Sequence, residues 1–124
     1  MPLASGEAAE REAERALVAR GWRILDRRLR VGRLEIDLLA RRDDIIAVVE
    51  VRGRRQGGWV DALDTLDPRK RAKIAAASRV LWSRRFANDP TVRVLRVDFI
   101  AVTWRATEAP LVEIAEGVID VNNA

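Results

Sequence analysis

The sequence predicts a single α/β domain in which a mixed sheet is covered by helices, with the elements in the order αβββαββ. Three observations support this fold class. The length of 124 residues suits one domain, the hydrophobic content of 48% is that of a globular protein, and the apolar spacing alternates between helical and strand periods. We expect the domain to span residues 1–124, with loose termini at 1–5 and 119–124.

Changes in the spacing of apolar residues set the predicted elements. Apolar residues three and four apart indicate a helix, whereas alternating or continuous apolar runs indicate strands. Asp67 followed by Pro68 is a typical helix start, because aspartate caps free N–H groups and proline fits the first turn. The predicted elements are a helix over residues 6–20, strands over 22–32, 34–38 and 45–51, a loop over 53–66, a helix over 67–84, and strands over 92–102 and 110–118.

The composition excludes several kinds of catalytic site. The chain contains no cysteine and no histidine, which excludes disulfides, the usual zinc sites, Ser-His-Asp triads and Cys-His proteases. Carboxylates, hydroxyls, arginines and two lysines, Lys70 and Lys73, remain for chemistry. No apolar run approaches the roughly 20 residues that a membrane span needs, so we expect a cytoplasmic protein without a membrane partner.

A predicted hairpin brings two acids together. A two-residue turn at Asp43–Asp44 would place Asp37 opposite Glu50. The same register places Glu35 opposite Arg52, so all four of these charged side chains would share one face of the sheet. The apolar residues between them would face the other way: Ile36, Leu38, Val49 and Val51.

Two opposed carboxylates need a partner. Directly opposed Cβ atoms lie about 4.5–5.5 Å apart, so the carboxylates would repel each other. Either a divalent cation with oxygen ligands or nearby arginines could offset this repulsion. The candidate arginines are Arg30, Arg52 and Arg54. The alternative is that the charges form the solvated face of an amphipathic hairpin. Glu50 favours a site, because it is the lone acid in the apolar run 45–51 and an acid there should have a partner.

Two short runs resemble a known family. Residues 35–40 (EIDLLA) and 49–54 (VEVRGR) resemble the core of the YraN-type family of uncharacterised proteins, which are predicted to be endonucleases. That family is similar to archaeal Holliday junction resolvases and to the PD-(D/E)xK restriction-nuclease superfamily. The resemblance covers most of the chain and implies a restriction-endonuclease-like, three-layer domain. Further matches lie in the opening helix, the second helix and a late strand: Gly6, Ala9, Glu10, Ala13, Lys70 and the run Arg96–Asp98.

The resemblance implies roles for individual residues. Asp37 and Glu50 would be ligands of Mg²⁺ or Mn²⁺, with the Val51 carbonyl as a candidate third. Glu10 would be an acid on the first helix near the metal, and Glu35 a supporting acid beside the ligands. The implied reaction is phosphodiester hydrolysis by metal-activated water, without a covalent intermediate.

Two positions depart from the family pattern. Leu34 stands where the family usually has glycine, and Arg52 stands at the position of the active-site lysine of the superfamily. A buried lysine can lose its proton and help to activate water, whereas arginine keeps its proton. Arg52 could instead stabilise negative charge on the phosphate or pair with Glu35. A lysine of the second helix, Lys70 or Lys73, could swing into the site.

Clusters of basic residues predict a nucleic-acid surface. Lysine and arginine clusters supply salt-dependent affinity for a phosphate backbone, although they can also form an ordinary solvated face. Trp59, in a glycine-containing loop, could stack on an unpaired base or cover the core. Because no base-reading motif is present, we expect recognition by shape or junction structure. The predicted contact residues are Arg30, Arg33, Arg54, Arg55, Arg69, Lys70, Lys73 and Trp59.

Three functions remain open from the sequence. The first is a metal-dependent, structure-selective nuclease that acts on DNA. The second is a nucleic-acid-binding domain of the same fold that lost activity together with the lysine. The third is a small interaction module whose charged hairpin pairs with itself across a dimer. Resemblance to the resolvases makes a homodimer a candidate assembly for the first function as well.

Overall fold

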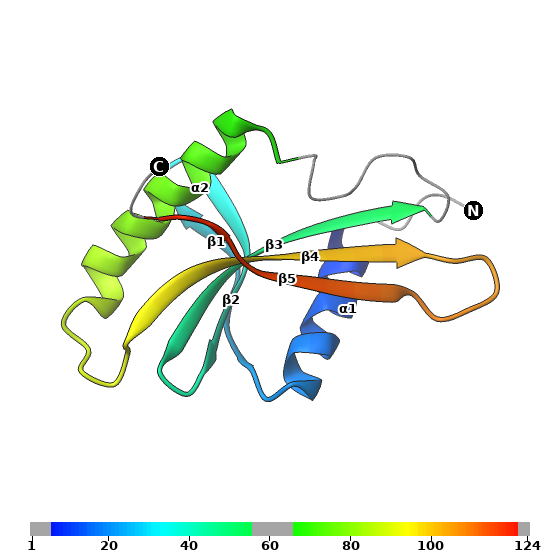
Figure 1. The fold of residues 1–124 in the computed structure, drawn as a ribbon, viewed down its shortest axis with the longest axis horizontal. Helices are drawn as coiled ribbons and strands as arrows, with labels where there is room; N and C mark the ends of the chain where they lie inside the picture. The colour runs from blue at the N-terminus through cyan, green and yellow to red at the C-terminus, as the bar shows by residue number, and fades with distance from the viewer. Residues whose placement is uncertain (1–5, 56–65, 122–124) are drawn as a thin grey trace.

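The computed structural model of the protein describes residues 6–55 and 66–121 (Figure 1). Five strands form one mixed sheet in the order β1-β2-β3-β4-β5, in which β3 and β4 are parallel and the other neighbours are antiparallel. The elements are α1 (Gly6–Ala19), β1 (Arg23–Val31), β2 (Leu34–Arg42), β3 (Ile45–Arg55), α2 (Pro68–Leu81), the π-helical turn η2 (Trp82–Phe86), β4 (Val94–Trp104) and β5 (Leu111–Ile119). The predicted fold class and the order αβββαββ are confirmed.

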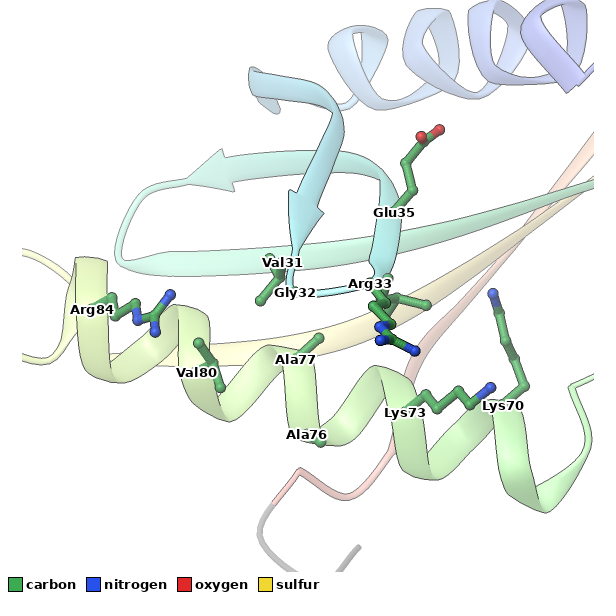
Figure 2. A pocket seen from close by; sticks show the side chains of 11 residues that line it. Val31, Gly32, Arg33, Glu35, Lys70, Lys73, Ala76, Ala77, Val80 and Arg84 are labelled. Atoms are coloured by element: carbon green, nitrogen blue, oxygen red, sulfur yellow. The ribbon is translucent and has the colours of Figure 1, made fainter.

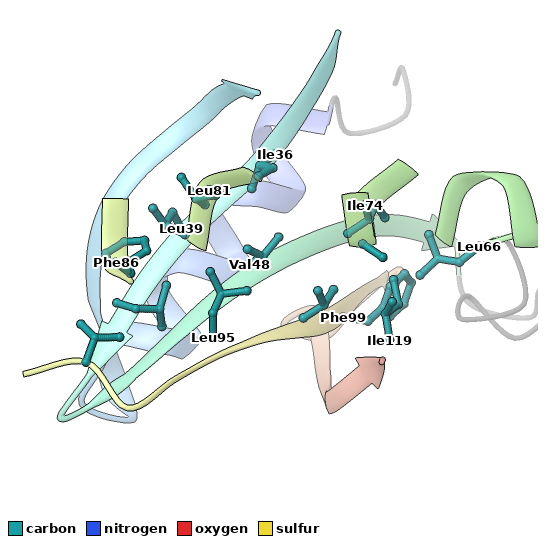
Figure 3. Packing of buried hydrophobic residues seen from close by; sticks show 14 of the residues in the cluster. Ile36, Leu39, Val48, Leu66, Ile74, Leu81, Phe86, Leu95, Phe99 and Ile119 are labelled. Carbon is teal, nitrogen blue, oxygen red and sulfur yellow. The ribbon is translucent and has the colours of Figure 1, made fainter. Parts of the chain in front are cut away.

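The sheet divides the apolar core into two clusters. The α1-side cluster lies between α1 and one face of the sheet, and it includes Ala9, Ala13, Leu17, Leu38, Ala40, Ala47, Val49, Val51, Ile100 and Val102. The α2-side cluster lies between α2 and the other face, and it includes Ile36, Leu39, Ile46, Val48, Ile74, Leu81, Leu95, Val97, Phe99 and Ala101 (Figure 3). The two helices therefore cover opposite faces of the sheet, which gives three layers.

Pairing with β4 extends β3 beyond its predicted end. The two strands pair along the whole length of β3, up to Arg55 opposite Trp104. Residues 53–55 therefore belong to a strand and not to the predicted loop. Gly53 suits this position, because a Cβ atom there would lie only 3.3 Å from the Ala9 Cβ and 3.3 Å from Trp104 Nε1.

Other element ends differ from the prediction by a few residues. The second helix continues from Leu81 as the wider turn η2 as far as Phe86. Ile119 is buried and pairs with Val97, so the expectation of a loose terminus from residue 119 is wrong at this position. The parts of the chain that lie outside the described residues are the predicted loose residues 1–5, residues 122–124, and loop residues 56–65, which include Trp59.

Strand β2 changes face at Asp37. Ile36 packs in the α2-side cluster, whereas Leu38, two residues later, packs in the α1-side cluster. The prediction that Ile36 and Leu38 share a face is therefore wrong. The physical reason lies in β1, where Arg28 stands between the pairs that β1 makes with Ile36 and Leu38 and has a left-handed φ of 51°. This twist interrupts the regular alternation of side chains along both strands.

The start of α2 yields a testable prediction. Asp67 Oδ1 accepts a hydrogen bond from the Lys70 backbone N–H at 2.8 Å, and Pro68 occupies the first turn. Asp67→Ala should lower the free energy of unfolding by about 1 kcal/mol, because one N–H of the helix terminus loses its acceptor. Urea unfolding followed by circular dichroism measures this change. Asp67→Asn is the matched control, since asparagine is also a good cap. An equal loss in both variants would contradict the capping role.

Candidate functional site

Two acids meet where the β2–β3 ladder ends. The predicted register is confirmed from the turn as far as Leu38 opposite Val49. The next position on each strand carries an acid, Asp37 on β2 and Glu50 on β3. The Val51 N–H group donates a hydrogen bond to Asp37 Oδ2 at 2.8 Å. A side-chain carboxylate thus accepts a hydrogen bond from a backbone N–H group of β3 at the position where the ladder stops.

Beyond this point the two strands have different partners. Glu35 of β2 pairs with Arg30 of β1, whereas Arg52 of β3 pairs with Ala101 of β4. The predicted opposition of Glu35 and Arg52 is therefore wrong, because the strands diverge before they reach it. The divergence leaves the acids at the junction of two half-sheets.

Asp37 is an unusually weak acid. The half-buried environment raises the pKa of Asp37 to about 7, first through loss of solvation and then through repulsion by Glu50. The Val51 N–H group and Arg52 act in the opposite direction, and Glu10 adds to the repulsion. A cation beside Asp37 would lower this pKa. Carboxyl groups with a raised pKa are often found in metal and substrate sites.

Glu50 has the cationic partners that its buried position requires. Its side chain lies on the α2 side of the sheet and only 4% of the residue is exposed. Arg52 Nη1 lies 2.7 Å from Glu50 Oε1, and Lys70 Nζ of α2 lies 3.8 Å from the same oxygen. Arg52 thus pairs with Glu50 and not with Glu35, and a helix lysine does approach the site.

The acid pair supplies two candidate oxygen ligands for a hard divalent cation. Among residues 6–55 and 66–121 no group of three or more acidic side chains surrounds one point. A bound cation would therefore use Asp37, Glu50, the Val51 carbonyl and oxygens of substrate or water, as Mg²⁺ commonly does. Arg52 Nη1 also donates to the Val51 carbonyl at 3.2 Å, so the guanidinium contacts two of these three donors. Arg52 would have to turn aside, which its partly exposed side chain permits.

The other two predicted acids lie toward α1. Glu10 accepts a hydrogen bond from Arg28 Nε at 3.2 Å and is close enough to raise the pKa of Asp37. Glu35 is exposed, and its side chain points toward α1 and away from α2 (Figure 2). Arg28, which the sequence did not single out, links this region to α1 through Glu10 and Glu7. Only a left-handed backbone places it there, and no local pattern signals that conformation.

The predicted nucleic-acid contacts lie around several features of the structure. Arg33, Lys70 and Lys73 line a common groove beside α2. Arg54 turns to β4 and β5, where it bonds Thr103 Oγ1 at 3.0 Å, and Arg55 lies beside Trp104 in a separate hollow. Arg30 and Arg69 are exposed.

The late motif of β4 has a structural role. Asp98 is 1% exposed and accepts hydrogen bonds from Arg96 Nε at 2.9 Å and from the Gly117 N–H at 3.0 Å. Its carboxylate therefore ties β4 to β5.

None of the helices in the described residues is long and apolar enough to cross a bilayer.

Fold and site together define an α/β protein that carries a pair of acids where strands β2 and β3 separate. The chain belongs to the uncharacterised protein family UPF0102, whose family model matches residues 9–102. This membership confirms the YraN-type resemblance. A UPF0102 protein of Sorangium cellulosum is 42% identical over 90% of this chain and 77% of its own length. UPF0102 proteins of Myxococcus xanthus (38% identical, 84% of this chain, 80% of theirs) and Agrobacterium fabrum (41%, 81% and 79%) are also similar.

The raised pKa of Asp37 predicts a pH-dependent stability. Between pH 3.8, the ordinary value, and pH 7, the folded state holds a proton that the unfolded state has lost. The free energy of unfolding should therefore fall as the pH rises through this window. Asp37→Asn keeps an oxygen acceptor for the Val51 N–H group and removes the charge. Without divalent cations at pH 8, it should be more stable than the wild type by about 1–3 kcal/mol.

Urea unfolding at several pH values between 4 and 8 measures this effect. The matched control is Asp43→Asn in the exposed hairpin turn, where the left-handed backbone also accepts asparagine. Equal stabilities of the two variants at pH 8 would show that Asp37 is not held against its ordinary ionisation.

Proposed function

We propose that this protein is a metal-dependent endonuclease that hydrolyses phosphodiester bonds in structured DNA. The observation that carries this proposal is the meeting of Asp37 and Glu50 at the end of the β2–β3 ladder. Together with the Val51 carbonyl they offer hard oxygen donors at the edge of a basic groove. A cytoplasmic location, with access to DNA, agrees with this function.

In this proposal the two acids would bind a metal ion, and the neighbouring cations would hold Glu50 in place. Mg²⁺ or Mn²⁺ bound by Asp37 and Glu50 would supply positive charge to the phosphate and lower the pKa of a water molecule. Asp37 is oriented by the Val51 N–H group, and Glu50 by Arg52 and Lys70. Fixed orientation of the ligands reduces the reorganisation that binding of the ion and substrate requires.

Arg52 and Lys70 would together supply the positive charge that the active-site lysine supplies in the superfamily. Arg52 keeps its proton, so its role is to stabilise negative charge that develops on the phosphate. Lys70 Nζ lies 3.8 Å from the same Glu50 oxygen that Arg52 contacts, so a second cation stands beside the candidate ligand. Lys70 therefore supports the proposal, since it adds positive charge where a phosphate would bind.

A second candidate is a nucleic-acid-binding domain without activity. The observation that favours it is the position of the Arg52 guanidinium, which contacts both Glu50 Oε1 and the Val51 carbonyl. If Arg52 stays there, it replaces the cation electrostatically and the site serves only to hold charge in place. DNA binding would then persist without cleavage.

Cleavage assays test the proposed activity. Incubation with branched, single-stranded and blunt duplex DNA, each with Mg²⁺ or Mn²⁺, should give cleavage of branched DNA that chelation by EDTA abolishes. Asp37→Ala should lower the rate at least about 100-fold, because the metal contributes several kcal/mol of charge stabilisation. Asp43→Asn in the exposed hairpin turn is the control, because asparagine tolerates the left-handed backbone there. Binding of branched DNA without metal-dependent cleavage by the wild type would support the inactive domain instead. Absence of any salt-dependent DNA affinity would favour the interaction module.

Substitutions of Arg52 and Lys70 test whether each of these cations contributes to cleavage. Arg52→Lys should raise the cleavage rate at least about tenfold, since position 52, whose side chain reaches Glu50 Oε1 more closely than Lys70 does, would then carry an amine that can take part in proton transfer. Lys70→Met should lower the cleavage rate, because the site loses a positive charge beside Glu50, whereas Arg15→Gln at an exposed position of α1 should leave the rate unchanged. An unchanged rate in Lys70→Met would exclude Lys70 from the reaction.

A further inference from the structure

A groove runs along α2 from the candidate site. It lies between the tip of the β1–β2 hairpin and the exposed side of α2, and its volume is about 790 Å³ (Figure 2). This volume falls within the roughly 300–1,000 Å³ of clefts that hold drug-sized ligands. The groove can therefore hold a short stretch of nucleotides.

The rim of the groove carries cations without acidic partners. Arg33, Lys73 and Arg84 line it and are exposed, and none of the three forms an ion pair with an acid in the described parts of the chain. Many other arginines of this protein do form such pairs, as Arg27 does with Glu14. One acid, Glu35, also lines the groove, but its side chain points toward α1 and away from α2 (Figure 2), so the excess positive charge of the lining attracts an anionic partner.

The floor of the groove is apolar. Val31, Leu34 and Val80 contribute to it, and Val80 is 38% exposed. A DNA duplex presents phosphates and sugars to a protein surface and keeps the faces of its bases stacked inside, whereas an unpaired strand exposes them. An apolar floor between cationic walls therefore matches an unpaired strand better than it matches a duplex.

Lys70 joins the groove to the acid pair. It lines the groove, and its Nζ lies 3.8 Å from Glu50 Oε1. A strand that lies in the groove would consequently pass next to the candidate metal ligands. Leu34, next to this region on β2, also lines the groove and adds to its apolar surface.

We propose that this groove binds an unpaired DNA strand, so that the substrate class of the site is a duplex with a single-stranded arm beside the scissile phosphate. This inference rests on the proposed nuclease function for its biological meaning, but the binding itself requires no catalysis. Arg33, Lys73 and Arg84 contact the phosphates of the arm, and Val31, Leu34 and Val80 contact its bases.

Binding without metal tests the inference. Fluorescence anisotropy in EDTA compares a labelled single strand, a blunt duplex, and the same duplex with an unpaired tail. The wild type should bind the tailed duplex more tightly than the blunt one. In Lys73→Gln/Arg84→Gln, the salt dependence of single-strand affinity should weaken by about 1.4 in logarithmic slope, since each phosphate contact contributes roughly 0.7. The matched control, Arg15→Gln/Arg20→Gln, removes the same charge from exposed positions at the α1 end of the molecule and should change the slope little.

A second variant separates apolar contacts from charge. Val80→Ser should weaken binding of the tailed duplex without changing the salt slope or the affinity for the blunt duplex. Its partly exposed position makes it compatible with the fold, which circular dichroism checks.

The outcomes distinguish this inference from the proposed function. Equal affinities of the wild type for tailed and blunt duplex, or equal slopes in the groove and control variants, would overturn the groove as a strand site, whether or not metal-dependent cleavage is observed. Groove-dependent binding of the tail supports the inference even if Asp37→Ala shows that no cleavage depends on the acid pair.

Discussion

The Val51 N–H group donates its hydrogen bond to a carboxylate where a regular ladder would offer it a backbone carbonyl. This contact ends the pairing of β2 with β3 and lets the sheet continue as two half-sheets. It also fixes Asp37 beside Glu50, the lone acid of an apolar strand. The groove, the approach of Lys70 and the change of face in β2 all occur around this one break in the ladder.

The two acids of the site are compensated unequally. Glu50 is buried and has both Arg52 and Lys70 close to one oxygen. Asp37 has an N–H donor, but burial and the neighbouring acid raise its pKa to about 7. A cation bound beside Asp37, as proposed above, would favour the charged form of this carboxyl group and lower its pKa.

The sequence predicted the features that depend on neighbouring residues, and it missed those that depend on distant parts of the chain. The Asp43–Asp44 turn set the hairpin register correctly because a two-residue turn leaves little freedom. The extension of β3 to Arg55 depends on its parallel partner β4, which no local window contains. The predicted opposition of Glu35 and Arg52 is wrong because β2 and β3 separate beyond Leu38 and Val49, and the spacing of side chains within the hairpin does not signal this separation. The approach of Lys70 to Glu50 likewise depends on how α2 packs on the sheet.

The left-handed Arg28 also has a consequence for the outer border of the molecule. β1 is an edge strand, and a long regular edge is a template onto which another chain can add by backbone hydrogen bonding. Its pairing is irregular between Ile24 and Asp26, and its backbone reverses its twist at Arg28. At the opposite edge, Gly117 of β5 has a φ of 61°. Both edge strands are thus irregular, and irregular edges disfavour the addition of a further strand.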